Sequence, residues 1–160
     1  KSKNTKIIIA PHDMKRGPAL EQLFPSAIKY TEIDERDTQL DAQILIIDCI
    51  GLLSKLYSYA DIAYVGGGFG NPGVHNILEP ATFGVPIVIG PNYSHFAEAT
   101  ALVGLGGCIS ISGGKQLQEQ FENLIQNSDI RHEKGHICDT FIKMNTGATG
   151  NILRYFDTKP

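Results

Sequence analysis

A glycine-rich segment in the middle of the chain carries the residues with the clearest chemical use. The stretch Gly66–Gly73 contains five glycines, and His75, Asn76 and Glu79 follow it. Glycines allow backbone conformations with positive φ and a close approach to phosphate, while a helix beginning after them presents unpaired N–H groups to an anion. The pattern indicates an anion site, although a glycine-rich connection without a ligand explains it equally well.

Glu79 is the side chain in this segment best suited to hold a sugar. A carboxylate one turn into a helix can accept hydrogen bonds from the 2′- and 3′-hydroxyls of a ribose without a metal. Asn76 and Glu79 also have the spacing of a helix capping box, which would give the glutamate a purely structural role. Pro80 favours the first helical position, so the start of this helix stays open between Asn76 and Pro80.

The same segment formally satisfies a dinucleotide-binding pattern, because Gly68–Gly73 reads G-x-G-x-x-G. That fingerprint normally joins the first strand to the first helix, and an acid at the end of the next strand binds the ribose. Here the next predicted strand ends in Ile89–Asn92, which contains no acid. The sequence also lacks a G-x-x-x-x-G-K-[ST] loop, so neither a dehydrogenase nor a phosphate-loop kinase is favoured.

Composition limits the number of domains in the chain and the kinds of partner that it can bind. The chain has 160 residues, 42% of them hydrophobic, which predicts one domain with a single core. Its 14 basic and 17 acidic residues give a net charge of −3, so a nucleic-acid partner is not expected. No apolar run approaches the ~20 residues of a membrane span, which predicts a soluble segment.

Cysteine and histidine spacing gives no sign of a metal site. Cys49, Cys108 and Cys138 are widely separated and are interpreted as buried thiols of a reducing compartment. His132 and His136 stand four residues apart, but without a third ligand they are better explained as part of a solvated helix face. We therefore expect neither a metal nor a cofactor.

Apolar runs of strand length alternate with helical patterns along most of the chain. The predicted strands are Lys6–Ala10, Ile28–Thr31, Ile44–Asp48, Ile62–Val65, Pro86–Ile89 and Cys108–Ile111. The predicted helices are Gly17–Phe24, Leu52–Tyr59, Asn76–Phe83, Ser94–Val103, Lys115–Gln126, Ile130–Met144 and Ala148–Phe156. This alternation predicts an α/β fold with a doubly wound, mostly parallel sheet, whose ligand site lies beyond the carboxyl ends of the strands.

Three segments carry a family resemblance: Tyr57–Gly68, Gly73–Ala81 and Gly84–Pro91. Further matching positions are Pro11 through Arg16, Asp48 through Leu53, Phe96 with Glu98, and Thr146 through Thr149. Together these motifs resemble the C-terminal domain of bacterial 3-deoxy-D-manno-octulosonic acid (Kdo) transferases, which are glycosyltransferases of the GT-B type. The resemblance implies that residues 1–160 form one Rossmann-like nucleotide-sugar-binding domain, the C-terminal half of such an enzyme.

The resemblance also implies a reaction and a place in the cell. The donor would be CMP-Kdo, and the full-length enzyme would transfer Kdo to lipid A precursor in lipopolysaccharide core biosynthesis, at the cytoplasmic face of the bacterial inner membrane. In this family the catalytic acid and the acceptor surface belong to the N-terminal domain, beside a membrane anchor. No catalytic residue is therefore expected in this chain, which would be inactive alone and would reach the membrane only through that other half.

The resemblance also implies roles for individual residues of this sequence. Glu79 would hold the ribose, His75 and Asn76 would lie near the phosphate, and Ile50 and Gly51 would pack against the cytosine. The backbone of Gly66, Gly67 and Gly68 would also lie near the phosphate.

The first strand departs from the family pattern. The family usually has Pro-Arg-His with a second arginine two residues later, and here Pro11 and Arg16 match cleanly while His12 replaces a fixed cation. Because histidine titrates near neutrality, we expect binding of the donor's phosphate or carboxylate there to be weaker or dependent on pH, unless Lys15 or Arg16 supplies the missing charge.

Two other interpretations remain open on the sequence. The chain could be the donor domain of another GT-B transferase, or of an epimerase, that uses a UDP-sugar. It could also be a non-catalytic nucleotide-binding module in which the Asn76–Glu79 motif only caps a helix.

Overall fold

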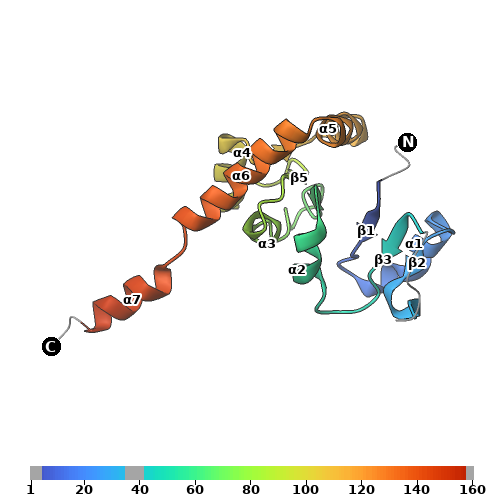
Figure 1. Ribbon diagram of the computed structural model, residues 1–160, viewed down its shortest axis with the longest axis horizontal. Helices are drawn as coiled ribbons and strands as arrows, with labels where there is room; N and C mark the ends of the chain where they lie inside the picture. The colour runs from blue at the N-terminus through green and yellow to red at the C-terminus, as the bar shows by residue number, and fades with distance from the viewer. Residues whose placement is uncertain (1–4, 35–41, 158–160) are drawn as a thin grey trace. The chain divides into compact units, whose positions relative to one another are not determined.

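The computed structural model describes residues 5–34 and 42–157 of the chain. These residues fall into two compact units, Lys1–Lys55 and Leu56–Pro160 (Figure 1). Each unit contains a parallel three-stranded sheet with helices in the connections.

The first unit is a small parallel sheet with the strand order β1-β3-β2. Its elements are β1 (Ile7–Ile9), the 3-10 turn η1 (Met14–Arg16), α1 (Gly17–Leu23), β2 (Ile28–Lys29), η2 (Tyr30–Glu32) and β3 (Ile44–Ile46). Asp13 caps η1 by accepting a hydrogen bond from the backbone N–H of Lys15 at 3.0 Å. Pro18 stands in the first turn of α1, where its missing N–H has no helical partner to lose.

The second unit holds the larger share of the core. Its strands are β4 (Ala63–Val65), β5 (Ile87–Ile89) and β6 (Cys108–Ser110), in that order and all parallel. Its helical elements are η3 (Tyr57–Tyr59), α3 (Leu78–Thr82), α4 (Ala97–Leu105), α5 (Gly114–Gln126), α6 (Ser128–Met144) and α7 (Ala148–Asp157), with α2 (Leu53–Leu56) at the boundary between the units.

The central strand β5 is buried on both faces, because apolar helices and loops cover the sheet on each side. All three of its residues are fully buried, as a continuous Ile-Val-Ile run predicts. One side packs with Val74, Ile77, Ala99 and Leu102, and the other with Ile111 and Leu124. The long helix α6 crosses close to the end of α3, where a Cβ on Gly135 would fall 2.1 Å from the carbonyl oxygen of Gly84.

The α/β class and the parallel pairing predicted from the sequence are confirmed, and all six predicted strands are present. The strands form two sets of three, and the prediction of a single domain over residues 1–160 stays a prediction. The predicted helix over Leu52–Tyr59 is split into α2 and η3. Within the described parts of the chain, no helix is long and apolar enough to cross a membrane.

Candidate functional site

The glycine-rich loop leaves β4 at the carboxyl edge of the second unit's sheet. Val65 pairs with Ile89, and Ile89 pairs with Ser110, so the three parallel strands end side by side. The segments that follow them, beginning at Gly66, Gly90 and Ile111, therefore share the edge at which α/β sheets bind ligands.

Three backbone hydrogen bonds fold this loop back on itself. The N–H of Gly70 donates to Gly67 O at 2.8 Å, and the N–H of Gly73 donates to Gly70 O at 3.2 Å. The N–H of His75 donates to Gly66 O at 3.0 Å, which returns the chain to the end of β4. These N–H groups already have partners within the chain, so any anion bound by the backbone must use other donors of the loop.

Asn92, in the segment after β5, holds the loop at three points. Its backbone N–H donates to Gly68 O at 2.8 Å, its carbonyl accepts from the N–H of Val74 at 3.1 Å, and its side-chain Nδ2 donates to Gly70 O at 3.2 Å. In the sequence, this position stands out only because it is not an acid. The Gly-Pro-Asn turn signal after the strand was the available hint that it supports a loop.

Backbone contacts within the chain require glycine at two or more positions of the loop. Gly67 has φ of +88°, and a Cβ there would lie 2.3 Å from the carbonyl oxygen of Gly73. A Cβ on Gly68 would lie 2.7 Å from the backbone nitrogen of Gly90. Glycine is therefore required at both positions by the fold alone, whether or not a phosphate approaches.

Asn76 and Glu79 form a hydrogen-bonded pair where the loop enters α3. Asn76 Nδ2 donates to Glu79 Oε1 at 2.9 Å, and Asn76 Oδ1 accepts from the N–H of Leu78 at 3.0 Å. The helix begins at Leu78, between the two starts that the sequence left open, because the Asn76 side chain satisfies the first-turn N–H. With only five residues, α3 has few aligned peptide dipoles, so the contribution expected from a helix terminus is weak.

Tyr57 lies beside this pair and was not singled out as a site residue from the sequence. It belongs to η3, which contacts α3. Burial raises the pKa of the Tyr57 phenol, and the nearby negative charge of Glu79 raises it further. Tyr57 therefore remains a protonated hydroxyl group at neutral pH in the vicinity of the candidate ribose-binding carboxylate.

The remaining predicted site residues belong to the first unit. His12 and Arg16 follow β1 and are exposed, and Ile50 and Gly51 follow β3, with Ile50 90% exposed. Since β1 and β3 are parallel neighbours, the structure brings these two loops to one edge of that unit's sheet. A donor site that also includes the Gly66–Glu79 segment of the second unit stays a prediction.

Asp48, Cys108 and Cys138 are structural side chains in this fold. Thr31 donates to Asp48 through both its backbone N–H and its hydroxyl, and the hydroxyl bond is the main reason that the pKa of this carboxyl is lowered. Burial raises the pKa of Cys108 and of Cys138 to about 12. Cys49 is only half-buried, so the prediction of a buried thiol is wrong there.

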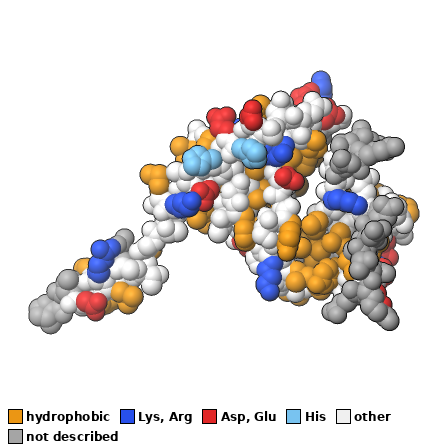
Figure 2. All heavy atoms as spheres, in the orientation of Figure 1, with side chains coloured by type: hydrophobic (Ala, Val, Ile, Leu, Met, Phe, Trp, Pro, Cys, Tyr) orange, Lys and Arg blue, Asp and Glu red, His pale blue; other side chains and the backbone are white. Residues whose placement is uncertain are grey.

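In residues 5–34 and 42–157, no three His, Cys, Asp or Glu side chains lie close enough together to hold a metal ion. On the face drawn in Figure 2, acidic and basic side chains are interspersed. On this face, the mixed charges do not build the extended positive field that a polyanion requires.

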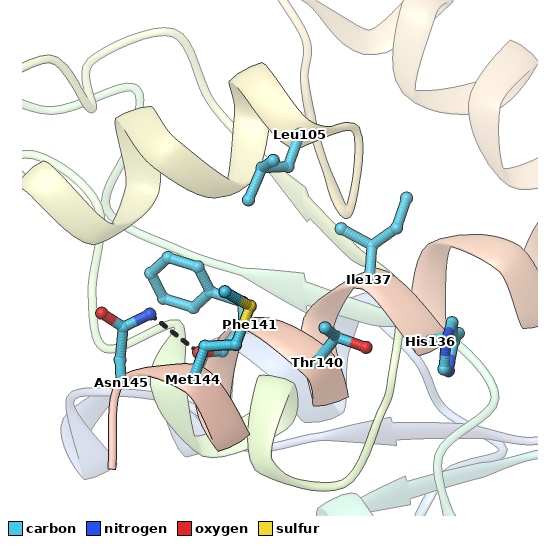
Figure 3. A pocket seen from close by; sticks show the side chains of 7 residues that line it. All are labelled: Leu105, His136, Ile137, Thr140, Phe141, Met144 and Asn145. Atoms are coloured by element: carbon cyan, nitrogen blue, oxygen red, sulfur yellow. Dashed lines mark hydrogen bonds between the residues drawn. The ribbon is translucent and has the colours of Figure 1, made fainter.

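A separate groove lies between α4 and α6, with a volume of about 470 Å³. Figure 3 shows its lining side chains, and Asn145 Nδ2 donates to the carbonyl of Phe141 at 2.8 Å at one end. The lining is mostly apolar and consists of Leu105, His136, Ile137, Thr140, Phe141, Met144 and Asn145. None of the predicted donor-site residues contributes to it.

Fold and site together define the class: an α/β domain with parallel sheets and, at the carboxyl edge of one sheet, a glycine-rich loop that leads into a helix bearing a carboxylate. Among solved structures, the C-terminal CMP-Kdo binding domain of WaaA from Acinetobacter baumannii has this fold. Its TM-score to this chain is 0.77 at 18% identity, and the match covers 88% of this chain and 75% of that one.

Sequence comparison identifies the relatives. The 3-deoxy-D-manno-octulosonic acid transferase of Chlamydophila psittaci is 38% identical over 112 residues, or 67% of this chain and 26% of the relative. The transferase of the same name from Chlamydia muridarum is 33% identical over 150 residues, or 91% of this chain and 34% of the relative. A bifunctional glycosyltransferase/methyltransferase of Fusobacterium nucleatum is 36% identical over 92 residues, or 55% of this chain and 14% of the relative. No family model matches the chain.

The chain is thus similar in sequence to part of the Kdo transferases, and it has the fold of the C-terminal CMP-Kdo binding domain of WaaA. It spans about a third or less of the length of the relatives named above.

Proposed function

We propose that this chain is the donor-binding domain of a Kdo transferase, which moves Kdo from CMP-Kdo to lipid A precursor in lipopolysaccharide core biosynthesis. The observation that carries the proposal is the sequence match to a Kdo transferase over 91% of the chain. The Asn76–Glu79 pair at the carboxyl edge of the sheet supports it, because a fixed carboxylate there suits the hydroxyls of a ribose.

The proposed contacts assign one part of the nucleotide to each group of residues. Glu79 accepts hydrogen bonds from the ribose hydroxyls, and His75 with the backbone of Gly66–Gly68 lies near the phosphate. From the first unit, Ile50 and Gly51 contact the cytosine, and the side chains of His12 and Arg16 contact the donor's anionic groups.

The complete reaction requires more than these residues. In the proposed enzyme, an N-terminal domain supplies the catalytic acid, the acceptor surface and the contact with the cytoplasmic face of the inner membrane. The 160-residue chain by itself is then expected to bind donor without turning it over.

A nucleotide titration followed by NMR tests the proposal residue by residue. With CMP as ligand, amide shifts are expected to cluster in Gly66–Glu79 and at Ile50–Gly51. UMP, which presents a different base edge, should produce the same pattern only at higher concentration.

Two other outcomes would favour a different function. Equal responses to CMP and UMP would favour a transferase or epimerase that uses a UDP-sugar. Shifts confined to regions outside the two named segments would leave Asn76 and Glu79 as a helix-start motif in a different kind of nucleotide-binding module.

A further inference from the structure

Tyr57 is half-buried in η3, which packs against α3, and α3 carries Glu79 in its first turn. The negative charge of Glu79 acts on the Tyr57 phenol, so the two side chains lie near one another. We propose that the Tyr57 hydroxyl is a further donor-binding group, which donates a hydrogen bond to a ribose hydroxyl that Glu79 also binds. This inference rests on the proposed function and adds a residue to its ribose site.

The Tyr57 hydroxyl and one oxygen of the Glu79 carboxylate are both available to a ligand. Asn76 Nδ2 donates to Oε1 of Glu79 at 2.9 Å, but in residues 5–34 and 42–157 no hydrogen bond reaches Oε2 or the Tyr57 hydroxyl. Within those residues, no side-chain nitrogen or oxygen is both fully enclosed and without a partner. The Tyr57 hydroxyl and Oε2 are therefore open to solvent, where a ligand can reach them.

These two open groups are complementary, because one donates and the other accepts. Burial, together with the charge of Glu79, raises the pKa of Tyr57, so its hydroxyl keeps its proton at neutral pH and can donate it. An ionised carboxylate only accepts hydrogen bonds. A ribose hydroxyl does both, so one hydroxyl can accept from Tyr57 and donate to Oε2 of Glu79 at the same time.

The charge of the Tyr57–Glu79 pair indicates which part of a nucleotide it holds. The carboxylate repels an anionic group, and a protonated phenol supplies no positive charge to offset that repulsion. A neutral hydroxyl meets no such repulsion. The pair therefore fits the ribose and not the phosphate, and it should discriminate against a deoxyribose, whose missing hydroxyl leaves both polar groups without a partner.

The substitution Tyr57→Phe removes the hydroxyl and keeps the ring. Because that hydroxyl has no partner among the described residues, the denaturation midpoint should not fall. Calorimetry should show CMP binding weakened by about three- to tenfold, for the loss of one hydrogen bond. Binding of 2′,3′-dideoxy-CMP should be the same in variant and wild type, because this ligand has no hydroxyl to accept the bond.

A double substitution tests whether both side chains bind the same hydroxyl. If they do, Tyr57→Phe combined with Glu79→Gln should weaken CMP binding by less than the product of the two separate factors. Factors that multiply would show that the two side chains act on separate parts of the ligand, which contradicts the shared hydroxyl.

Tyr59→Phe is the matched control. Tyr59 belongs to the same short turn as Tyr57, but its side chain is 80% exposed. The substitution removes the same atom from the same element. It should leave the affinity for CMP and for the dideoxy nucleotide unchanged, and a loss of CMP affinity equal to that of Tyr57→Phe would contradict a specific role of Tyr57.

Two results with Tyr57→Phe would overturn the inference. CMP binding equal to that of the wild type would show that the hydroxyl meets only solvent. Equal weakening for CMP and for the dideoxy nucleotide would show that Tyr57 acts on another part of the nucleotide or on the packing of α3. Failure of the wild-type chain to bind CMP would defeat the proposed function as well, so the wild-type titration distinguishes the two failures.

Discussion

Gly68 and Gly90 lie backbone to backbone at the carboxyl edge of the second sheet, so close that a Cβ on Gly68 would stand 2.7 Å from the nitrogen of Gly90. This contact joins the segment after β4 to the segment after β5. The contact fixes the position of the glycine-rich loop whether or not a ligand is bound.

Substituting Gly68 should therefore destabilise the fold. We expect Gly68→Ala to lower the free energy of unfolding by about 1–3 kcal/mol, because the methyl group meets rigid backbone and not a flexible side chain. Chemical denaturation measures the change. Gly104→Ala is the control, since a Cβ there meets nothing within 4 Å and the residue is helical; it should be neutral or stabilising by up to about 1 kcal/mol. Equal effects of the two substitutions would contradict the close contact.

Removing the Glu79 carboxylate distinguishes a ribose ligand from a helix cap. Glu79→Ala should weaken CMP binding by roughly 1–3 kcal/mol if the carboxylate holds the ribose. Calorimetry gives the affinity, and denaturation gives the stability of the same variant. Asp129→Ala removes an exposed acid from the first turn of α6 and should leave CMP affinity unchanged. Unchanged affinity in Glu79→Ala, together with lost stability, would support the capping role.

The side chain of Asn92 should control the rigidity of the loop. Asn92→Ala removes the bond from Nδ2 to Gly70 O but keeps the two backbone bonds of that residue. A net hydrogen bond contributes about 0.5–1.5 kcal/mol, so we expect faster hydrogen exchange at the Gly70 and Gly73 amides and a modest loss of CMP affinity. Exchange rates identical to those of the wild type would show that the side chain does not hold the loop.

The three thiols should differ in reactivity. Burial raises the pKa of Cys108 and Cys138 to about 12, so at pH 8 iodoacetamide should alkylate the half-buried Cys49 first. Mass spectrometry of the native chain after timed alkylation measures the order. Labelling of Cys138 as fast as Cys49 would contradict the packing of α6 on the sheet.

The same pKa shifts predict a loss of stability in alkali. An ordinary thiol ionises near pH 9, so in the unfolded chain both groups lose their protons above that value while the folded chain retains them. Since the folded state then binds more protons, the free energy of unfolding should fall as the pH rises from about 9 towards 12. Denaturation midpoints at pH 8 and pH 10 test the sign, and Cys108→Ala should reduce the difference between them.

Patterns within one element were enough to predict most of the fold. The Ile-Val-Ile run of β5 predicted a strand covered on both faces, because a continuous apolar run has no polar side to expose. The helical spacing of Leu117, Phe121 and Leu124 predicted α5, whose Leu124 is fully buried. Such patterns depend on neighbours a few residues apart, which the sequence displays directly.

The details of the site depend on partners distant in sequence, and these were not predictable. Gly68 packs against Gly90, 22 residues away, so the sequence could not tell a glycine required by the fold from one required by a phosphate. The return of the loop to the end of β4 depends on the bond from the N–H of His75 to Gly66 O, nine residues away, which no local pattern displays. Asn92 likewise bonds to Gly68 and Gly70, which lie more than 20 residues earlier in the chain, so its role could not be predicted from neighbouring residues.

The affinity of the chain for CMP relative to UMP tests the central claim most directly. If this is the donor domain of a Kdo transferase, isothermal titration calorimetry should show CMP binding at least about tenfold more tightly, a difference of about 1.4 kcal/mol, with the preference retained in Gly104→Ala. Equal affinity for the two nucleotides, or tighter binding of UMP, would contradict the assignment of CMP-Kdo as the donor.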